Sequence, residues 1–281
     1  MFNISENMPF AFNEALSNFN FKNMDLESID SDYYKKVEKL DKSKWYYFNR
    51  DIDYIHNEYG YRSDLISDIE SNDYLLTFGC SYSYGYGLFY EDTYSYKLSK
   101  KLGLKNINLS VPGTGLGFHV TNSTLFFNYL INKNLRLPKY VIIQYPSWSR
   151  LGFFEKEIQD EQINLLGKTA SSSENRNIKT FYKNYWILNA GESLKESMVS
   201  PIYINNLWES LGVSTFHIDF GDFNQDRYKS NFQNFSIVDY STFQDNQYEE
   251  NYYELARDLS HNGKEFHSMI FKDILNKIKN G

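Results

Sequence analysis

The sequence lacks what several classes of protein require. Cys80 is its only cysteine, so no disulfide can form within the chain. No run approaches the roughly 20 apolar residues that a membrane-spanning helix needs. Lysine and arginine number 29 against 36 aspartates and glutamates, for a net charge of −7, whereas binding to phosphate backbones needs clustered cations. We therefore expect no nucleic-acid partner and no membrane insertion, and a neutral or cationic ligand is easier to accommodate.

The first residues also lack the features of an export signal. Residues 1–7 contain neither a basic start nor an apolar core. With no such signal and one cysteine, we expect a cytoplasmic protein that leaves the cell by lysis, as part of a particle, or by a signal-independent route. The bias toward Tyr, Asn and Lys is typical of an AT-rich genome such as that of a phage, which makes a virion-associated protein the alternative.

The chain does have enough apolar residues for a substantial core. Of its 281 residues, 41% are hydrophobic and 18% are aromatic, which predicts one large α/β domain with extensions. Much of its polarity comes from Tyr, Asn and Lys, and tyrosine rings bury well while keeping a polar tip. The composition therefore does not indicate a disordered chain.

The pattern along the chain changes near Tyr74. Residues 1–70 are polar and rich in Asn and Asp, with a helix expected at 31–40, and are interpreted as an extension packed on the main domain, 71–281. From Tyr74 onward, short apolar runs alternate with amphipathic stretches, which is typical of βαβ units around a parallel sheet. Residues 152–193 interrupt this pattern and are interpreted as an insertion or lid.

The expected elements follow from these runs. The clearest strand is 140–145, where β-branched residues cluster and the near-continuous apolarity fits a central position. The other strands are expected at 74–78, 106–109, 213–218 and 235–238. The helices are expected at 93–102, 118–132, 194–211 and 262–278. We find no internal repeat.

Residues that could carry chemistry follow these strands. Ligands bind beyond the carboxyl ends of the strands in an open parallel sheet, so the strand ends are informative. Ser81 follows the first strand, and Asp258 and His261 lie three positions apart before the last helix. A serine on a Gly-rich turn can attack a carbonyl when a histidine takes its proton and a carboxylate orients that histidine. The residues therefore predict a hydrolase.

At these segments the chain resembles the SGNH (GDSL-type) hydrolases, serine esterases and lipases with a flavodoxin-like α/β/α fold. The family's first block, Gly-Asp-Ser-x-x-x-Gly after a strand, is similar to Gly79–Gly85, with Cys80 in place of the aspartate. Its last block, Asp-x-x-His, is similar to Asp258–His261, with His267 downstream. The resemblance implies a three-layer α/β/α domain with a central parallel sheet. It also implies that Ser81 is the nucleophile, His261 the general base and Asp258 the partner that orients it.

The resemblance also suggests the groups of an oxyanion hole. The second block is similar to Asn108–Gly113 and points to the amide of Gly113, alongside that of Ser81. In the third block, Trp148 stands where the family usually has Asn, and its indole N–H can donate one hydrogen bond. Loss of one oxyanion donor commonly costs about 2.7 to 4 kcal/mol of transition-state stabilisation. The altered third block is therefore also compatible with a slow or specialised enzyme. The other candidates for this donor are Gln144, Ser147 and Arg150.

The resemblance covers roughly 57–155 and 213–271. Its lead-in, Asn57–Asp64, is similar to that of a subset of bacterial and phage SGNH proteins. Residues 113–117 suggest a dinucleotide loop, but Phe118 breaks the Gly-x-Gly-x-x-Gly spacing, so we expect no cofactor. The remaining histidines lack metal-ligand spacing, so we expect structural roles and no metal at His56, His119, His217 and His267. Cys80 is expected to be a small buried residue.

Two functions remain open from the sequence. The first is a serine esterase that acts on an O-acyl or O-acetyl group of a carbohydrate, with a small-molecule or glycan ester as substrate. The alternative is a catalytically weak or inactive SGNH-like domain that binds glycans or forms part of a virus particle. The altered third block keeps the alternative open. Nothing in the sequence specifies an oligomeric state.

Overall fold

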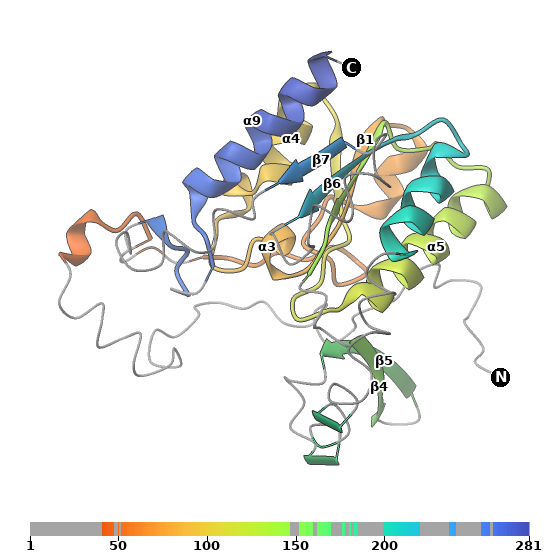
Figure 1. Cartoon of the computed structure of the whole chain (residues 1–281), viewed down its shortest axis with the longest axis horizontal. Coiled ribbons are helices and arrows are strands. Elements are labelled where there is room, and N and C mark those ends of the chain that lie inside the picture. Colours follow the sequence, from red (N-terminus) through yellow and green to blue (C-terminus); the bar gives the residue numbers. More distant parts are fainter. Residues whose placement is uncertain are drawn as a thin grey trace.

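The structure is a computed structural model with a five-stranded sheet at its centre (Figure 1). Its strand order is β2-β1-β3-β6-β7, and every neighbouring pair is parallel. The structure describes residues 41–47, 50, 52–146, 152–159, 162–169, 176–177, 180, 183–184, 199–219, 236–239, 254–258 and 261–280.

The central strands are the predicted apolar runs. The sheet consists of β1 (Tyr74–Phe78), β2 (Lys105–Asn108), β3 (Tyr140–Gln144), β6 (Ser214–Asp219) and β7 (Ser236–Asp239). Every residue of β1 is buried, because this strand lies inside the sheet and is covered on both faces. The predicted parallel α/β sheet is confirmed.

Side chains that alternate along β1 and β3 enter two separate cores. Leu76 and Val141 join one core, which also contains Phe126 of α5 (Leu116–Asn132) and Trp208 of a helix over 199–209. Leu75 and Ile142 join the other, with side chains from α4 (Tyr94–Leu102) and α9 (Lys264–Asn280). The two faces of the sheet therefore carry different helices, which gives the predicted three-layer α/β/α architecture (Figure 1).

The helix boundaries lie close to the predicted ones and have local causes. Thr93 precedes α4, and its hydroxyl accepts a hydrogen bond from the Tyr96 amide at 3.4 Å. Gly103 ends the helix with φ of +69°, a conformation that glycine adopts without strain. Pro201 lies within the helix that is described over 199–209. The predicted start of that helix, 194–198, lies outside the described residues, as does the helix expected at 31–40.

The expected insertion begins with a hairpin that the sequence pattern did not predict. β4 (Gly152–Gln159) pairs antiparallel with β5 (Gln162–Thr169), and Gly152 lies opposite Thr169. Only Asp160 and Glu161 separate the strands, and this pair is not one of the glycine-containing dipeptides that signal a two-residue turn. The hairpin lies on the side of the sheet where α3 (Ser81–Tyr84) is found (Figure 1).

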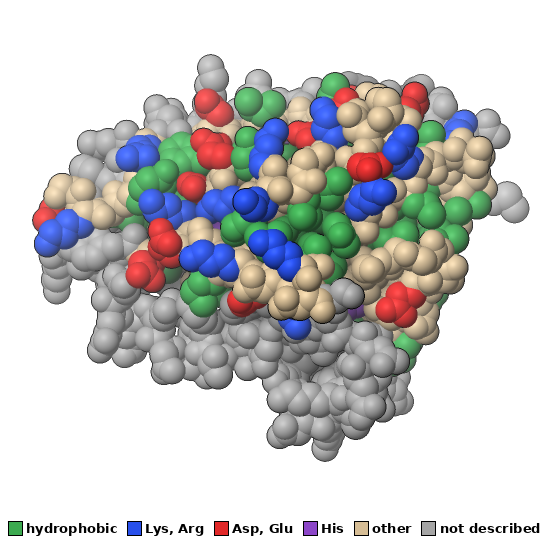
Figure 2. Space-filling view, turned by 90° about the horizontal axis from the view of Figure 1, so that it is seen from above, with side chains coloured by type: hydrophobic (Ala, Val, Ile, Leu, Met, Phe, Trp, Pro, Cys, Tyr) green, Lys and Arg blue, Asp and Glu red, His purple; other side chains and the backbone are tan. Residues whose placement is uncertain are grey.

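The described part of 41–70 packs against loops of the α/β unit. Trp45, Tyr47, Ile52 and Tyr54 form a third core with Tyr84, Leu88, Leu255 and Ala256. These partners belong to α3 and the loop after it, and to the loop before α9, which are far apart in the sequence. No helix within the described ranges is both long and apolar enough to cross a bilayer. On the face shown in Figure 2, basic and acidic side chains are interspersed.

Candidate active site

Ser81 is the first residue of the short helix α3, directly beyond the carboxyl end of β1. Gly79 makes the turn between strand and helix possible, because a Cβ atom there would lie 2.2 Å from the Ser83 Oγ atom. Gly85 ends the helix with φ of +79°. The turn therefore presents Ser81 at the edge of the sheet where ligands bind in open parallel folds.

Gln144, the last residue of β3, holds this turn in place through hydrogen bonds. Its side chain is fully buried, and its Oε1 accepts hydrogen bonds from the Cys80 amide at 3.0 Å and the Ser83 hydroxyl at 3.2 Å. Its Nε2 donates to the Tyr145 carbonyl at 2.5 Å. These bonds involve both ends of the amide, so Gln144 holds the turn that carries Ser81. As an oxyanion donor Gln144 stays a prediction.

His261 connects Ser81 to Asp258. The His261 Nε2 atom lies 2.7 Å from the Ser81 Oγ atom, and Nδ1 is hydrogen-bonded to Oδ2 of Asp258. A carboxylate accepts only, so we assign the imidazole proton to Nδ1, which leaves Nε2 to accept the serine hydroxyl proton. The arrangement has the connectivity of a nucleophile, a base and an orienting acid.

A tight loop presents Asp258 and His261 together. The Ala256 amide donates to the His261 carbonyl at 2.8 Å, and the His261 amide donates to Oδ1 of Asp258 at 3.2 Å. At the base of the loop, the Gly263 amide donates to the Glu254 carbonyl at 2.7 Å, and a Cβ on Gly263 would lie 2.2 Å from that oxygen. The three-residue spacing therefore places acid and base within one closed loop.

Of the residues predicted for the oxyanion hole, some are described in the structure and others are not. The Val111 amide donates to the Gly79 carbonyl at 3.0 Å, which continues the pairing of β1 and β2 beyond the strand ends. Gly113 follows two residues later and therefore lies at the same edge as Ser81. Its φ is +76°, and no heavy atom of the described residues lies within 4 Å of a Cβ built on it. Trp148, Ser147 and Arg150 lie outside the described residues.

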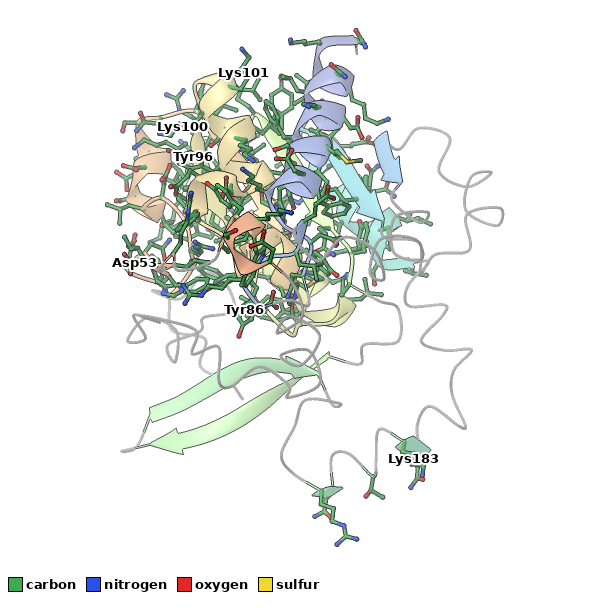
Figure 3. All side chains as sticks on the ribbon, turned by 90° about the vertical axis from the view of Figure 1, so that its left-hand side faces the viewer. Asp53, Tyr86, Tyr96, Lys100, Lys101 and Lys183 are labelled. Atoms are coloured by element: carbon green, nitrogen blue, oxygen red, sulfur yellow. The ribbon has the colours of Figure 1, made fainter. Side chains whose placement is uncertain are left out.

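Two tyrosine rings flank the imidazole of His261. The Tyr82 and His261 ring centroids are 4.9 Å apart with the planes at 65°, and those of Tyr86 and His261 are 5.4 Å apart at 53°. Burial raises the pKa of Tyr86, and the charge of Asp258 raises it further. Figure 3 shows Tyr86 at the margin of the α/β unit that faces the β4–β5 hairpin. The rings thus shape the space around the base.

The other histidines have structural surroundings. His267 accepts the Tyr94 amide on Nδ1 at 3.2 Å and stacks on the Tyr94 ring, and burial lowers its pKa to about 3. His217 is also buried, with a pKa of about 3, and its Nδ1 lies 2.7 Å from the Tyr145 hydroxyl. His56 lies 2.8 Å from the Tyr84 hydroxyl, and His119 is buried in α5.

Two other sources of chemistry would be the Cys80 thiol and a cluster of metal-binding side chains. The Cys80 thiol is buried and donates to Oε1 of Gln144 at 3.1 Å, so it lies under the turn. Within the described ranges no group of three or more His, Cys, Asp or Glu side chains could hold a metal ion. Ser81 is thus the nucleophile candidate that has a base within hydrogen-bond distance.

Sequence reasoning missed two residues that shape the site. Gly87 has φ of +76°, and a Cβ there would lie 3.0 Å from Oδ1 of Asp258. Tyr54 accepts the Gly87 amide on its hydroxyl at 2.7 Å. The glycine pair at 85 and 87 is a local signal for an unusual turn. The contact with Tyr54, from a segment outside the family resemblance, has no such signal.

Comparison with known proteins finds likeness in solved structures. TesA aligns with a TM-score of 0.46 and 10% identity, over 74% of this chain and 99% of that one. A G-D-S-L family protein from Desulfitobacterium hafniense DCB-2 gives 0.44 and 14%, over 72% and 98%. The acetyl xylan esterase Est2A from the rumen bacterium Butyrivibrio proteoclasticus gives 0.40 and 12%, over 74% and 64%. No protein-family model and no curated protein matches the chain.

These likenesses concern the arrangement of the backbone. One of the proteins with a similar backbone is described as a member of the G-D-S-L family. A phage origin stays a prediction. The chemistry follows from the side chains of Ser81, His261 and Asp258, which the structure brings together from segments 180 residues apart.

Proposed function

We propose that this protein is a serine hydrolase that cleaves a carboxylic ester, with an O-acyl group on a carbohydrate as the preferred substrate. The hydrogen-bonded series from Ser81 Oγ through His261 to Asp258 carries the proposal, because it supplies a nucleophile, a base for its proton and an acid that fixes the base.

The first half of the reaction transfers the acyl group to the protein. Ser81 Oγ attacks the ester carbonyl carbon while its proton passes to Nε2 of His261. The resulting oxyanion accepts hydrogen bonds from the amides of Ser81 and Gly113, both at the carboxyl edge of the sheet. When the tetrahedral intermediate collapses, the C–O bond to the sugar breaks, and His261 gives its proton to the leaving alcohol oxygen. The acyl group is then an ester of Ser81.

The second half returns the serine. A water molecule gives a proton to Nε2 of His261 and attacks the acyl carbon, and the new intermediate expels the Ser81 oxygen, which takes the proton back. The products are the free carboxylic acid and the unchanged site. In both halves Asp258 stays ionised and stabilises the imidazolium that forms transiently.

The aromatic rings around the base support a sugar as the alcohol part. Tyr86 is half-buried, and its ring lies beside His261, where the leaving alcohol must accept a proton. Its hydroxyl has no hydrogen-bond partner among the residues that the structure describes. A ring with a free hydroxyl at its edge suits a ligand that offers both C–H faces and hydroxyl groups.

The test is the hydrolysis of p-nitrophenyl acetate by the wild type, Ser81→Ala and Cys80→Ala. We expect Ser81→Ala to lose activity to the buffer rate and Cys80→Ala to keep it. A fluorophosphonate probe should add covalently to Ser81 in the wild type and in Cys80→Ala, as read by peptide mass spectrometry. Equal rates for the wild type and Ser81→Ala would reject the enzyme and leave a glycan-binding or structural domain.

The substrate class is tested separately. Acetylated oligosaccharides and their non-carbohydrate counterparts, such as glycerol triacetate, are compared by acetate release. We expect a higher kcat/KM on the acetylated sugars. A preference for the simple esters would retain the hydrolase and remove the carbohydrate assignment.

A further inference from the structure

The described residues of the segment 45–62, which are 45–47, 50 and 52–62, contact both loops that carry the site. Trp45 donates its indole N–H to the Leu255 carbonyl at 2.9 Å, and Arg257 donates from Nη1 to the Arg50 carbonyl. Leu255 and Arg257 belong to the loop that carries Asp258. One side of the site is therefore attached to residues that precede the first strand of the sheet.

The same segment holds the loop after Ser81. Arg62 is 1% exposed, and its guanidinium donates to the Gly85 carbonyl at 2.7 Å and to the Leu88 carbonyl at 2.8 Å. Its Cζ also lies 4.5 Å from the centre of the Tyr54 ring. A buried guanidinium that serves backbone carbonyls fixes a loop in place, because each carbonyl needs a donor when water is excluded.

Tyr54 lies where these two attachments meet. Its ring is 3% exposed and stacks on Tyr84, with centroids 5.7 Å apart and planes at 11°. Its hydroxyl accepts the amide of Gly87 at 2.7 Å, and the Gly87 carbonyl accepts the amide of Arg257 at 2.9 Å. Gly87 is thus bonded on one side to Tyr54 and on the other to the residue before Asp258.

Gly87 also touches the carboxylate. A Cβ on Gly87 would lie 3.0 Å from Oδ1 of Asp258, so the backbone of this residue forms part of the wall behind the acid. Burial raises the pKa of Tyr54 to about 12, and although the charge of Arg62 lowers it, that of Asp258 raises it. The phenol therefore stays protonated at neutral pH, within the field of the Asp258 carboxylate.

We propose that Tyr54 is a positioning residue for Asp258, acting through Gly87, and that residues 45–62 are a brace that holds the loops of Ser81 and Asp258 in register. This inference rests on the proposed serine-hydrolase function, since it concerns the precision of the same site. The segment that precedes the sheet is then a working part of the active site.

The experiment is a double-mutant cycle in the full chain, with p-nitrophenyl acetate as substrate. Tyr54→Phe removes the acceptor of the Gly87 amide and keeps the ring. We expect kcat to fall by about 10- to 100-fold with little change in KM, because small displacements of a catalytic group cost this much. In an Asp258→Asn background, where the carboxylate has already been lost, Tyr54→Phe should change kcat by less than about twofold.

The matched control is Tyr74→Phe, outside the brace. Tyr74 is a fully buried tyrosine at the start of β1, and its hydroxyl donates to the Arg136 carbonyl at 2.8 Å, away from Gly87. We expect it to lower thermal stability while kcat stays within about twofold of the wild type, in either background. Circular dichroism melts are recorded for every variant, and activity is assayed well below each melting temperature. A loss of kcat under these conditions reports displacement of Asp258 in the folded protein and not unfolding.

The outcomes discriminate. A Tyr54→Phe variant with wild-type kcat, or one whose loss multiplies with that of Asp258→Asn, overturns the inference. If Tyr54→Phe does not fold, Gly87→Ala takes its place in the cycle, because it displaces Asp258 from the same backbone; a multiplicative loss again overturns the inference. Ser81→Ala as active as the wild type would instead reject the hydrolase itself.

Discussion

Nε2 of His261 lies 2.7 Å from the Oγ atom of Ser81, although 180 positions separate the two residues. One lies after the first strand and the other before the last helix, so the bond exists only when the sheet is complete and α9 is docked. Activity is therefore a direct report on assembly of the fold.

The two partners of this imidazole are expected to respond differently to substitution. His261→Ala should abolish turnover because, among the described residues, His261 is the base within hydrogen-bond distance of the Ser81 hydroxyl. Asp258→Asn should retain a measurable remnant, about 10⁴-fold below the wild type, because the carboxylate orients and stabilises while the imidazole transfers the proton. Steady-state kinetics with p-nitrophenyl acetate measure both.

The control for these variants is His267→Ala. His267 is buried and accepts the first amide of α4, so we expect lower stability with kcat close to the wild type in the folded protein. Loss of activity in folded His267→Ala, with activity kept in His261→Ala, would show that the base has been assigned to the wrong histidine.

Gly87→Ala should impair both stability and catalysis. The φ of +76° disfavours any side chain, and a methyl group would lie 2.9 Å from Ala256 Cβ and 3.0 Å from Asp258 Oδ1. We expect a loss of about 1 to 3 kcal/mol in the free energy of unfolding, the usual cost of such backbone strain, with a fall in kcat. Urea denaturation and kinetics measure the two effects.

Gly103→Ala is the matched control for that substitution. Gly103 has φ of +69°, and no atom of the residues that the structure describes lies within 4 Å of a Cβ built on it. Alanine there therefore introduces backbone strain but no contact with Asp258. It should lose stability and keep kcat. If both glycine variants kept full activity, the close approach of Gly87 to Asp258 would have no catalytic consequence.

Stability should fall between pH 7.5 and pH 5.0. Burial holds the pKa values of His217 and His267 at about 3, against an ordinary value of 6.5. Between these values the unfolded chain binds more protons than the folded one, so the stabilisation is present above pH 6.5 and declines as the pH falls. The linkage predicts a loss of about 2 kcal/mol per histidine at pH 5.0, measured by urea unfolding.

A variant with both residues changed to glutamine tests the origin of this decline. Glutamine keeps hydrogen-bonding groups but does not titrate, so the variant should be less stable at pH 7.5 and should lose less on acidification. An unchanged pH dependence would assign the decline to other groups.

Tyr86→Ala should change substrate preference. Loss of the ring beside His261 is expected to lower kcat/KM on acetylated oligosaccharides about tenfold more than on p-nitrophenyl acetate, within the roughly 0.5 to 1.5 kcal/mol that aromatic ring contacts contribute. Tyr96→Ala is the control, since Tyr96 lies on α4, far from Tyr86 in Figure 3. An equal effect on both substrates would remove Tyr86 from recognition of the sugar.

The sequence predicted the central strands because burial on both faces demands continuous apolar runs. β3 is the clearest case, with predicted bounds of 140–145 and observed bounds of Tyr140–Gln144. The pairing of Ser81, His261 and Asp258 was predictable because a short motif accompanies each local turn. The β4–β5 hairpin was missed because its turn lacks glycine and its strands do not alternate strictly.

The sequence pattern around a residue does not predict a role that depends on a contact with a distant part of the chain. The role of Gln144 depends on a neighbouring strand and that of Tyr54 on Gly87, 33 positions away. Such pairings are fixed by tertiary packing, which no periodicity encodes. The predicted domain boundary at residue 70 and the role of Trp148 stay predictions.

The loop closed by Glu254 and Gly263 has a consequence for how the site can move. Because Asp258 and His261 are joined within it, any shift of the loop carries acid and base together, and their mutual geometry persists. Ser81 lies on a separate turn that Gln144 of β3 holds in place. A displacement between this turn and the loop therefore breaks the hydrogen bond between Ser81 and His261 while the acid–base pair stays assembled, and the bond from the Arg257 amide to the Gly87 carbonyl opposes that displacement.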